Sequence, residues 1–198
     1  MNILNIYRNG IVAGAIASVF ILSSTIAVAD VNLVKNGGFE SPSISHGTWK
    51  VYTAIPGWTA EPGSNSMGCG IEIQNNVAGA PYRGRQHVEL NSYCPSGMVQ
   101  VLHTNKNKKY DLCFAYSPRP GVEDNKIRVK WNGASVLVLD RDGRSFTKTD
   151  WNMYCINDLK ATSTSTKLEF IAETKSLITS VGGYIDSVSV EVLKRGFH

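Results

Sequence analysis

Charged residues are scarce in this sequence, and that scarcity excludes several classes of protein. Only 18% of the 198 residues are Asp, Glu, Lys or Arg, while 42% are hydrophobic, so neither a coiled coil nor an intrinsically disordered chain fits. The 18 Gly and 7 Pro exclude a collagen-like or an all-helical chain. The net charge of +4 comes without a long basic run, which gives no support to nucleic-acid binding. The length allows one medium domain or at most two small ones.

Catalytic signatures are also missing. The sequence has no Gly-x-Ser-x-Gly elbow, no His-Glu-x-x-His helix and no phosphate-cradling Gly-rich loop after a strand. Glu72 and Glu89 raise the question of glycoside hydrolysis, which needs two carboxylates across a cleft. With 16 acidic residues some pair will meet that distance by chance, so we predict that the protein is not an enzyme.

The first 29 residues have the pattern of a cleaved signal peptide. Arg8 supplies the positive charge, residues 11–26 form the apolar stretch, and Ala27-Val28-Ala29 is a small-x-small cleavage site. We expect one domain over residues 30–198, released by a bacterium to the periplasm or the outside. An uncleaved anchor is the alternative, but Gly and Ser interrupt the apolar stretch. Residues 194–198 carry no apolar tail, so we expect no membrane anchor in the mature chain.

Four cysteines follow this segment, at positions 69, 94, 113 and 155. An even number in an exported chain predicts two disulfides, for which three connectivities exist. We favour Cys69 with Cys94, in loop-like sequence, and Cys113 with Cys155, in strand-like sequence. A zinc site is the weaker alternative because no C-x-x-C spacing occurs.

The rest of the chain is typical of short strands separated by turns. Apolar residues alternate with period two over residues 110–116 and 127–131, and residues 136–139, 168–171 and 184–192 have a similar character. Gly-, Pro- and Asn-rich turns separate these stretches, and Asn132-Gly133 indicates a hairpin. No sustained helical period is present. An antiparallel β-sandwich is therefore the expected architecture.

Several motifs resemble a known fold and family. The opening residues 32–40, Ile55-Pro56-Gly57-Trp58 and the closing residues 183–190 resemble the two ends of a galactose-binding-like jelly roll. Between them, residues 70–74, 84–90, 116–121 and 129–133 resemble secreted proteins of family 642 of the domains of unknown function. The resemblance implies an all-β jelly roll, a fold that houses many carbohydrate-binding modules, although it also serves adhesion.

The resemblance also implies a structural calcium ion. In similar modules, a Glu after the first strand and an Asp at the start of the last strand meet around such an ion, and Glu40 and Asp186 match them. The alternative is that Glu40 is a solvated turn residue and that Asp186 accepts hydrogen bonds from backbone amides.

Sugar recognition needs an exposed aromatic ring and planar polar groups. Trp49 and Tyr52 are the first stacking candidates, since their segment is predicted to run from a loop into a strand. Tyr82 and Tyr93, in turn-rich sequence, rank second. Trp58, Trp131 and Trp151 are expected in the core.

The polar candidates lie in or beside the motifs quoted above: Glu72, Gln86, Glu89, Arg119 and Asn125. Arg119 has an alternative role, since it could pair with Glu123 or Asp124 within its own loop. The basic cluster Lys106, Lys108 and Lys109 suits a solvated turn better than a site for an acidic polysaccharide.

We therefore predict a secreted, non-catalytic carbohydrate-binding protein whose partner is a polysaccharide. The alternative is an adhesion or matrix scaffold without a sugar site, and a glycoside hydrolase ranks third. Burial of the aromatic candidates would favour the scaffold. The sequence predicts neither the glycan nor the oligomeric state.

Overall fold

The computed structural model describes residues 31–61, 69–92, 95–173 and 181–193. In these residues the chain forms twelve β-strands and no helix, which confirms the all-β prediction. The strands are β1 (Thr48–Tyr52), β2 (Ala54–Ile55), β3 (Trp58–Ala60), β4 (Ile71–Asn75), β5 (His87–Glu89), β6 (Gly97–His103), β7 (Lys109–Ser117), β8 (Ile127–Trp131), β9 (Ala134–Leu139), β10 (Asn152–Lys160), β11 (Ser165–Ala172) and β12 (Tyr184–Val192).

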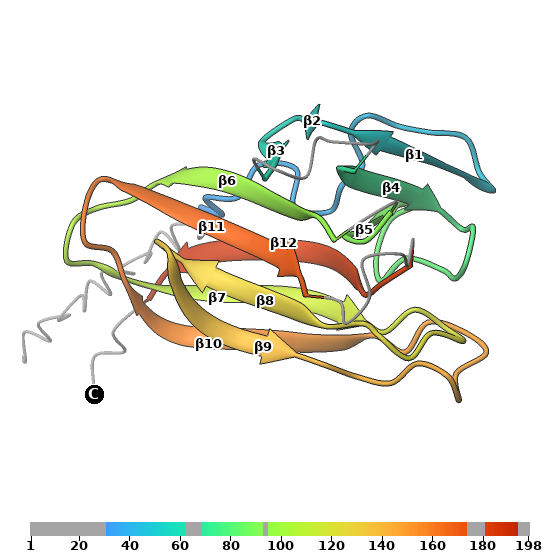
Figure 1. Ribbon diagram of the computed structural model, residues 1–198. Helices are drawn as coiled ribbons and strands as arrows, with labels where there is room; N and C mark the ends of the chain where they lie inside the picture. The colour runs from blue at the N-terminus through green and yellow to red at the C-terminus, as the bar shows by residue number, and fades with distance from the viewer. Residues whose placement is uncertain (1–30, 62–68, 93–94, 174–180, 194–198) are drawn as a thin grey trace, which may run out of the picture.

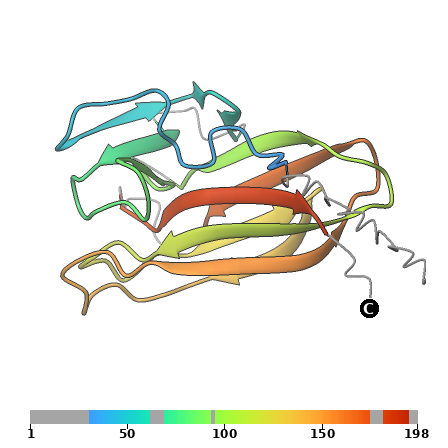
Figure 2. The same ribbon diagram turned by 180° about the vertical axis from the view of Figure 1, so that it is seen from behind.

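Two antiparallel sheets of six strands pack face to face. Sheet A has the strand order β1-β4-β5-β12-β7-β10 and lies toward the viewer in Figure 2. Sheet B has the order β2-β3-β6-β11-β8-β9 and lies toward the viewer in Figure 1. The last strand, β12, therefore lies between β5 and β7 in the middle of sheet A. This arrangement is the predicted β-sandwich.

The core fills the space between the sheets. Phe114 of sheet A meets Phe170 of sheet B with ring centroids 5.0 Å apart, and Trp58 lies 6.0 Å from Phe170. Trp58 and Trp131 are buried, as predicted. Alternation along each strand sends the neighbouring residues to the outer faces, where ligands can reach them.

The strongest sequence patterns match the strands closely. Residues 127–131 and 184–192 coincide with β8 and β12, and residues 110–116 lie inside β7. Asn132 and Gly133 join β8 to β9 with φ values of 50° and 84°. Two positive φ values in a two-residue loop define the hairpin turn that Asn-Gly predicts.

The predicted pairing of Cys113 with Cys155 is confirmed. The bond joins directly opposite residues of β7 and β10 and encloses a sequence separation of 42 residues. Cys94 lies outside the described residues, and with it the second predicted pairing. The predicted signal peptide lies outside them as well. No helix of the part that the structure describes is long and apolar enough to cross a membrane.

The two ends of the described chain are tied together at one end of the sandwich. The Leu33 amide donates to the Val190 carbonyl oxygen, 2.9 Å away, and the Val188 amide donates to the Gly37 carbonyl at 2.8 Å. The Asn32 side chain accepts a hydrogen bond from the Val190 amide at 2.9 Å. The N-terminal segment therefore continues the bonding of β12 as far as residue 37.

Candidate functional site

The outer face of sheet A carries an unusual set of polar side chains. Ile71, Ile73 and Val88 of β4 and β5 point into the core, so their neighbours Glu72, Gln74, His87 and Glu89 share the opposite face. In the strand register Glu72 lies opposite Glu89, and Gln74 lies opposite His87. Tyr184 of β12 lies opposite Glu89 and continues this row. Strand alternation thus gathers residues from three strands at one place.

A hollow of about 190 Å³ lies over this row. Its lining comes from β1, β4 and four loops: Trp49, Glu72, Gln74, Val77, Ser92, Arg119 and Val181. Trp49 stands at one side, opposite Gln74 in the register, and is 46% exposed. The hollow is smaller than a drug-sized ligand pocket, so it suits one sugar ring rather than several.

The floor of the hollow is a hydrogen-bonded carboxyl pair. The Gln74 side-chain amide donates to Glu72 Oε1 at 2.8 Å and also to Glu89 Oε2. Glu72 and Glu89 lie directly opposite each other on β4 and β5, so their ionised forms repel each other. Burial raises the pKa of Glu72, and burial together with the repulsion from Glu72 raises the pKa of Glu89 to about 8. The pair therefore keeps a proton at a pH where an exposed glutamate is ionised.

Arg119 closes one side of the hollow. Its Nη1 atom donates to both carboxylate oxygens of Glu89, at 2.9 and 2.6 Å. Its other guanidinium nitrogens make no hydrogen bond to a described residue. The alternative pairing of Arg119 within its own loop is wrong, because Glu123 pairs with Arg144 instead, at 3.2 Å.

Asn125 positions this loop rather than a ligand. Its Oδ1 atom accepts the Arg119 amide at 2.8 Å, and its side-chain amide donates to the carbonyls of Val122 and Arg141. The side chain is fully buried, so it is not a direct sugar contact in this arrangement. The sequence predicted Asn125 as a ligand contact, whereas in the structure its hydrogen bonds support the loop that carries Arg119.

Unpartnered buried polar atoms concentrate at this face. Gln74 Oε1, Ser92 Oγ, the Tyr184 hydroxyl and both ring nitrogens of His87 have no hydrogen-bond partner in the described part of the chain. All four side chains are buried, with at most 2% of their surface exposed. Buried polar groups normally have partners, so such a cluster indicates a place where water or a ligand supplies them.

His87 lies in an aromatic enclosure next to the hollow. Its ring centroid is 4.4 Å from that of Tyr184 and 5.6 Å from that of Trp151. Burial, with a smaller contribution from Arg119, lowers the pKa of His87 to about 3, so the ring is neutral at physiological pH. Trp151 covers this outer face instead of joining the core between the sheets, where the sequence placed it.

The remaining aromatic candidates lie apart from Trp49. Tyr52 is three residues further along β1, so it points to the opposite face and packs against the core. We therefore leave Tyr52 out of the site. Tyr82 is partly buried against Trp151, with ring centroids 6.2 Å apart. Tyr93 lies outside the described residues.

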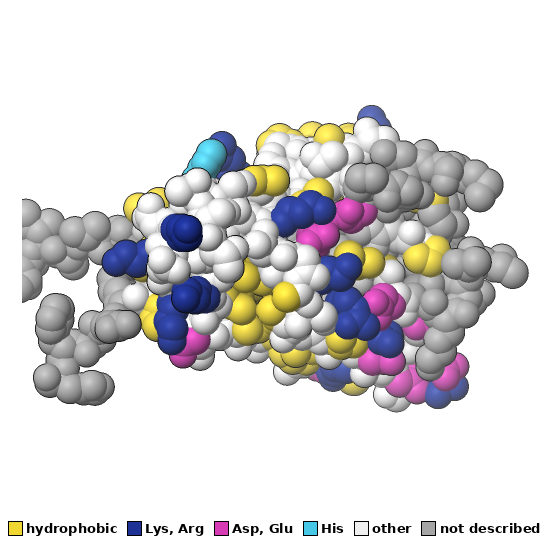
Figure 3. Space-filling model, turned by 60° about the vertical axis from the view of Figure 1, so that its left-hand side comes forward, with side chains coloured by type: hydrophobic (Ala, Val, Ile, Leu, Met, Phe, Trp, Pro, Cys, Tyr) yellow, Lys and Arg dark blue, Asp and Glu magenta, His cyan; other side chains and the backbone are white. Residues whose placement is uncertain are grey.

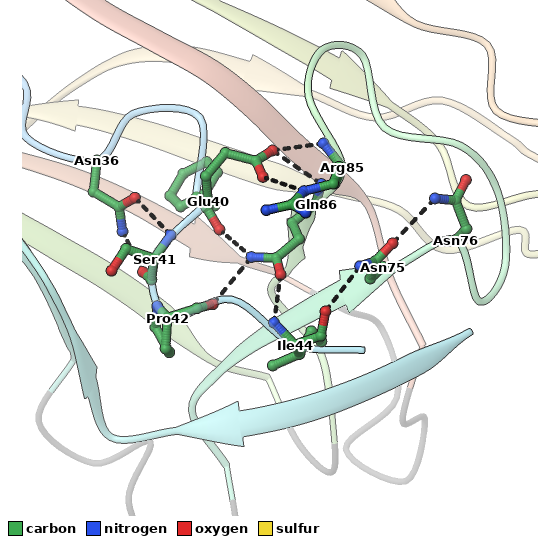
Figure 4. Close-up of polar contacts among 10 residues, drawn as sticks. Asn36, Glu40, Ser41, Pro42, Ile44, Asn75, Asn76, Arg85 and Gln86 are labelled. Atoms are coloured by element: carbon green, nitrogen blue, oxygen red, sulfur yellow. Dashed lines mark hydrogen bonds and ion pairs between the residues drawn. The ribbon is translucent and has the colours of Figure 1, made fainter. Parts of the chain in front are cut away.

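Gln86 holds part of the N-terminal segment in place through side-chain hydrogen bonds (Figure 4). Its side-chain amide donates to the carbonyls of Phe39 and Pro42, at 2.7 and 3.1 Å, and its Oε1 atom accepts the Ile44 amide at 2.7 Å. The side chain is fully buried and these bonds use its polar atoms. Gln86 therefore holds residues 39–44 in place and is not carried into the sugar site.

Glu40 and Asp186 hold the loop over residues 82–86 from its two ends. Glu40 Oε1 accepts the amides of Arg85 and Gln86, and Asp186 Oδ2 accepts those of Tyr82 and Arg83. These bonds match the alternative in which Asp186 accepts backbone amides. They leave Glu40 only partly exposed, at a fixed position.

The same two carboxylates also fit a hard cation in their chemistry. Burial, with a contribution from Glu40, raises the pKa of Asp186 to about 7. A bound calcium ion would stabilise the ionised form of Asp186, but main-chain oxygens or water would have to complete the coordination shell of the ion. In the described ranges no three His, Cys, Asp or Glu side chains gather closely enough to hold a metal. Calcium stays a prediction.

The basic cluster lies at the other end of the molecule. Lys106, Lys108, Lys109 and Lys160 line a larger and shallower hollow with Val192 and Leu193. All four lysines are exposed, and Lys109 pairs with Asp158 at 2.6 Å. Among the described residues that line this hollow there is no aromatic side chain to form a platform for a sugar ring. On the face of the molecule that Figure 3 draws, basic side chains are spread out, and several have acidic side chains beside them.

Sequence reasoning found Trp49, Glu72, Glu89 and Arg119, but it missed several members of the site. Gln74 and His87 lie inside the quoted motifs, and their alternation with Ile73 and Val88 could have placed them on the face of Glu72 and Glu89. Ser92, Tyr184 and Trp151 join through pairing and loop packing, which a single sequence does not reveal.

Comparison with known proteins supports the fold. The K2 cleaved adhesin domain of Lys-gingipain is 14% identical, with a TM-score of 0.53 over 84% of this chain and 99% of that chain. TmCBM61, solved in complex with β-1,4-galactotriose, is 16% identical, with a TM-score of 0.50 over 82% of this chain and 99% of that chain. No curated protein matches the sequence.

The family model described as a protein of unknown function, DUF642, matches residues 32–191. This range runs from the segment that pairs with the last strand to the end of β12, and it includes both sheets and the whole hollow. The chain therefore belongs to the DUF642 family, and it has the galactose-binding-like β-sandwich that its sequence motifs predicted.

Proposed function

We propose that the protein is a non-catalytic glycan-binding protein and that the hollow on the outer face of sheet A holds one sugar unit. The observation that carries this proposal is the set of unpartnered polar atoms of Gln74, Ser92 and Tyr184 beside the half-exposed ring of Trp49. A sugar ring offers both hydroxyl groups for such atoms and an apolar face for an indole. The fold shared with TmCBM61, whose structure contains a galactan fragment, agrees with this function.

The carboxyl pair supports binding rather than hydrolysis. Glu89 is fully buried, and Arg119, Gln74 and the Gly182 amide occupy its oxygens. A glycosidase needs a carboxyl group on each side of the scissile bond, whereas Glu72 and Glu89 lie directly opposite each other on neighbouring strands, and Glu89 is buried. Both groups therefore serve as hydrogen-bond partners at the floor of the hollow.

The scaffold alternative depends on burial of the aromatic candidates. Tyr52 and Tyr82 are partly buried, but Trp49 remains 46% exposed beside the hollow. Of the described candidates, Trp49 alone keeps an exposed ring, so the stacking platform is not removed. We also infer export from the cell, with which the disulfide between Cys113 and Cys155 is compatible.

The test is a binding screen of the purified protein against immobilised plant, bacterial and animal polysaccharides. We expect saturable binding to at least one class, lost in Trp49→Ala and retained in Val101→Ala, a matched control on the outer side of sheet B that is 58% exposed. Release of reducing sugar during the assay would indicate hydrolysis. Absence of binding by a folded, disulfide-intact sample would favour the scaffold.

A further inference from the structure

The electrostatic balance of the hollow restricts the sugar that it can accept. Among the described residues, the charged groups that line it are Glu72 and Arg119, and the buried Glu89 pairs with Arg119, while the neighbouring His87 and Tyr184 are neutral. The cluster has no net charge when the carboxyl pair holds one proton and a charge of −1 when it holds none. In neither state is it positive.

Arg119 is the only cation of the hollow among the described residues, and it is already committed. Its Nη1 atom bonds to both oxygens of Glu89, which is fully buried. An acidic sugar that recruited Arg119 would leave the Glu89 carboxylate buried without its partner, and such a charge is costly. An acidic sugar that did not recruit it would bring its own unpaired charge against Glu72 and Glu89.

Two other sets of cations among the described residues, Lys50 and the basic cluster, do not reach the hollow. Lys50 belongs to β1 but points to the side opposite Trp49, with its Nζ atom 5.4 Å from the centre of the Tyr52 ring. The cluster Lys106, Lys108 and Lys109 lies at the start of β7, whereas Arg119 follows the end of that strand. Nine residues of strand separate the two ends, a distance of about 27 Å.

We infer that the hollow accepts an uncharged sugar unit and rejects one that carries a carboxylate, a conclusion that rests on the proposed function. Hydroxyl groups can donate to the carboxyl oxygens of Glu72 and to Gln74 Oε1. The same hydroxyls can accept from the Arg119 nitrogens that bond to no described residue. A neutral sugar thereby supplies hydrogen-bond partners to the polar atoms of the hollow without disturbing the pairing of Arg119 with Glu89.

The experiment compares neutral hexose polymers with the same polymers after oxidation of the C6 hydroxymethyl group to a carboxylate. We expect the oxidised form to bind at least about tenfold more weakly, since its carboxylate would have no cationic partner in the hollow. Methyl esterification of the oxidised polymer removes the charge without restoring the hydroxyl. We expect it to recover most of the binding.

A variant of the protein tests the role of the ion pair. In Glu89→Gln the guanidinium of Arg119 has lost its ion pair with Glu89. We therefore expect the affinity of this variant for the oxidised polymer to rise severalfold relative to its affinity for the neutral polymer. Circular dichroism and thermal unfolding establish that this variant is folded. If it is not, the comparison of the three polymers on the unaltered protein still decides.

Four outcomes separate the inference from the proposed function on which it rests. Equal or tighter binding of the oxidised polymer, lost in Trp49→Ala, overturns the charge selectivity but upholds a glycan site. Failure of esterification to restore binding also overturns it, because the hydroxyl and not the charge would then matter. Absence of binding to every polymer overturns the proposed function. Binding of the oxidised polymer that survives Trp49→Ala but is lost in Lys106→Gln/Lys108→Gln lies outside the hollow and upholds the selectivity.

Discussion

Glu72 and Glu89 lie directly opposite each other on strands β4 and β5, and one side-chain amide, that of Gln74, donates to both. Two ionised carboxyl groups on directly opposite residues of neighbouring strands repel each other, and a proton on one of them removes the repulsion. Their environments differ: Glu89 is held by Arg119, whereas Glu72 faces the hollow. The two residues should therefore respond differently to the same substitution.

Glu72→Gln should weaken glycan binding by about tenfold while changing the free energy of unfolding little, because an amide replaces the carboxyl group without leaving a cation unpaired. Glu89→Gln should lower the free energy of unfolding by about 2 kcal/mol, less than for a fully buried pair since the Arg119 side chain is 21% exposed. Urea unfolding of both variants measures the difference. Equal destabilisation by the two would contradict the assigned roles.

Substitutions of Trp49 should give a graded loss of affinity. Trp49→Tyr keeps an aromatic ring and should lose less than about threefold, whereas Trp49→Ala should lose about tenfold or more. Neither change should lower the melting temperature much, because the side chain is 46% exposed. Titration calorimetry with the best glycan of the screen provides the measurement. Equal affinities for both variants would show that the ring does not stack.

The pH dependence of stability should follow Glu89 on the alkaline side. Its pKa is about 8 in the fold and near 4.5 when unfolded, so its stabilising contribution is complete below about pH 4.5 and is lost as the pH rises through 8. His87, with a pKa of about 3 in the fold against 6.5, contributes above pH 6.5 and loses that contribution as the pH falls.

Between pH 7 and 8.5 the carboxyl pair should therefore dominate, and the protein should become less stable as the pH rises. Glu89→Gln removes this titration and should flatten the slope. Urea midpoints at the two pH values test this expectation, with His46→Gln, an exposed histidine, as the matched control. An unchanged slope in Glu89→Gln would assign the titration to another group.

Calcium should stabilise the fold if Glu40 and Asp186 bind it. We expect the melting temperature to rise on addition of millimolar Ca²⁺ and to fall with a chelator, with both responses lost in Glu40→Gln. Glu123→Gln, an exposed glutamate on another loop, is the control. A melting temperature that ignores calcium would mean that the amides of residues 82–86 are the only partners of these carboxylates.

The disulfide between Cys113 and Cys155 should contribute to stability by restricting the unfolded chain. A closed loop of 42 residues corresponds to about 4 kcal/mol in the chain-entropy model. Cys113→Ser/Cys155→Ser should therefore unfold at lower urea concentration but still bind glycan, since the bond lies away from the hollow. Unaltered stability would mean that the two strands are already ordered in the unfolded state.

The sequence predicted strands best where both faces had a simple pattern. Residues 127–131 alternate between core and surface and coincide with β8. Strand β10 was indicated only as strand-like sequence around Cys155, without bounds, because most of its side chains are exposed and no apolar period marks it. Gln86 shows a different limit: its amide could serve a ligand or a backbone segment equally well, and only the folded chain brings Phe39 and Ile44 to it.

The pairing of Leu33 with Val190 places the first and last described strand positions at one end of the sandwich, while the hollow beside Tyr184 lies near the other end of β12. Fusion partners joined next to these residues would therefore start at the end of β12 that is remote from the hollow. Copies linked in series could each engage the same polymer, and their combined affinity would exceed that of one copy without any new contact.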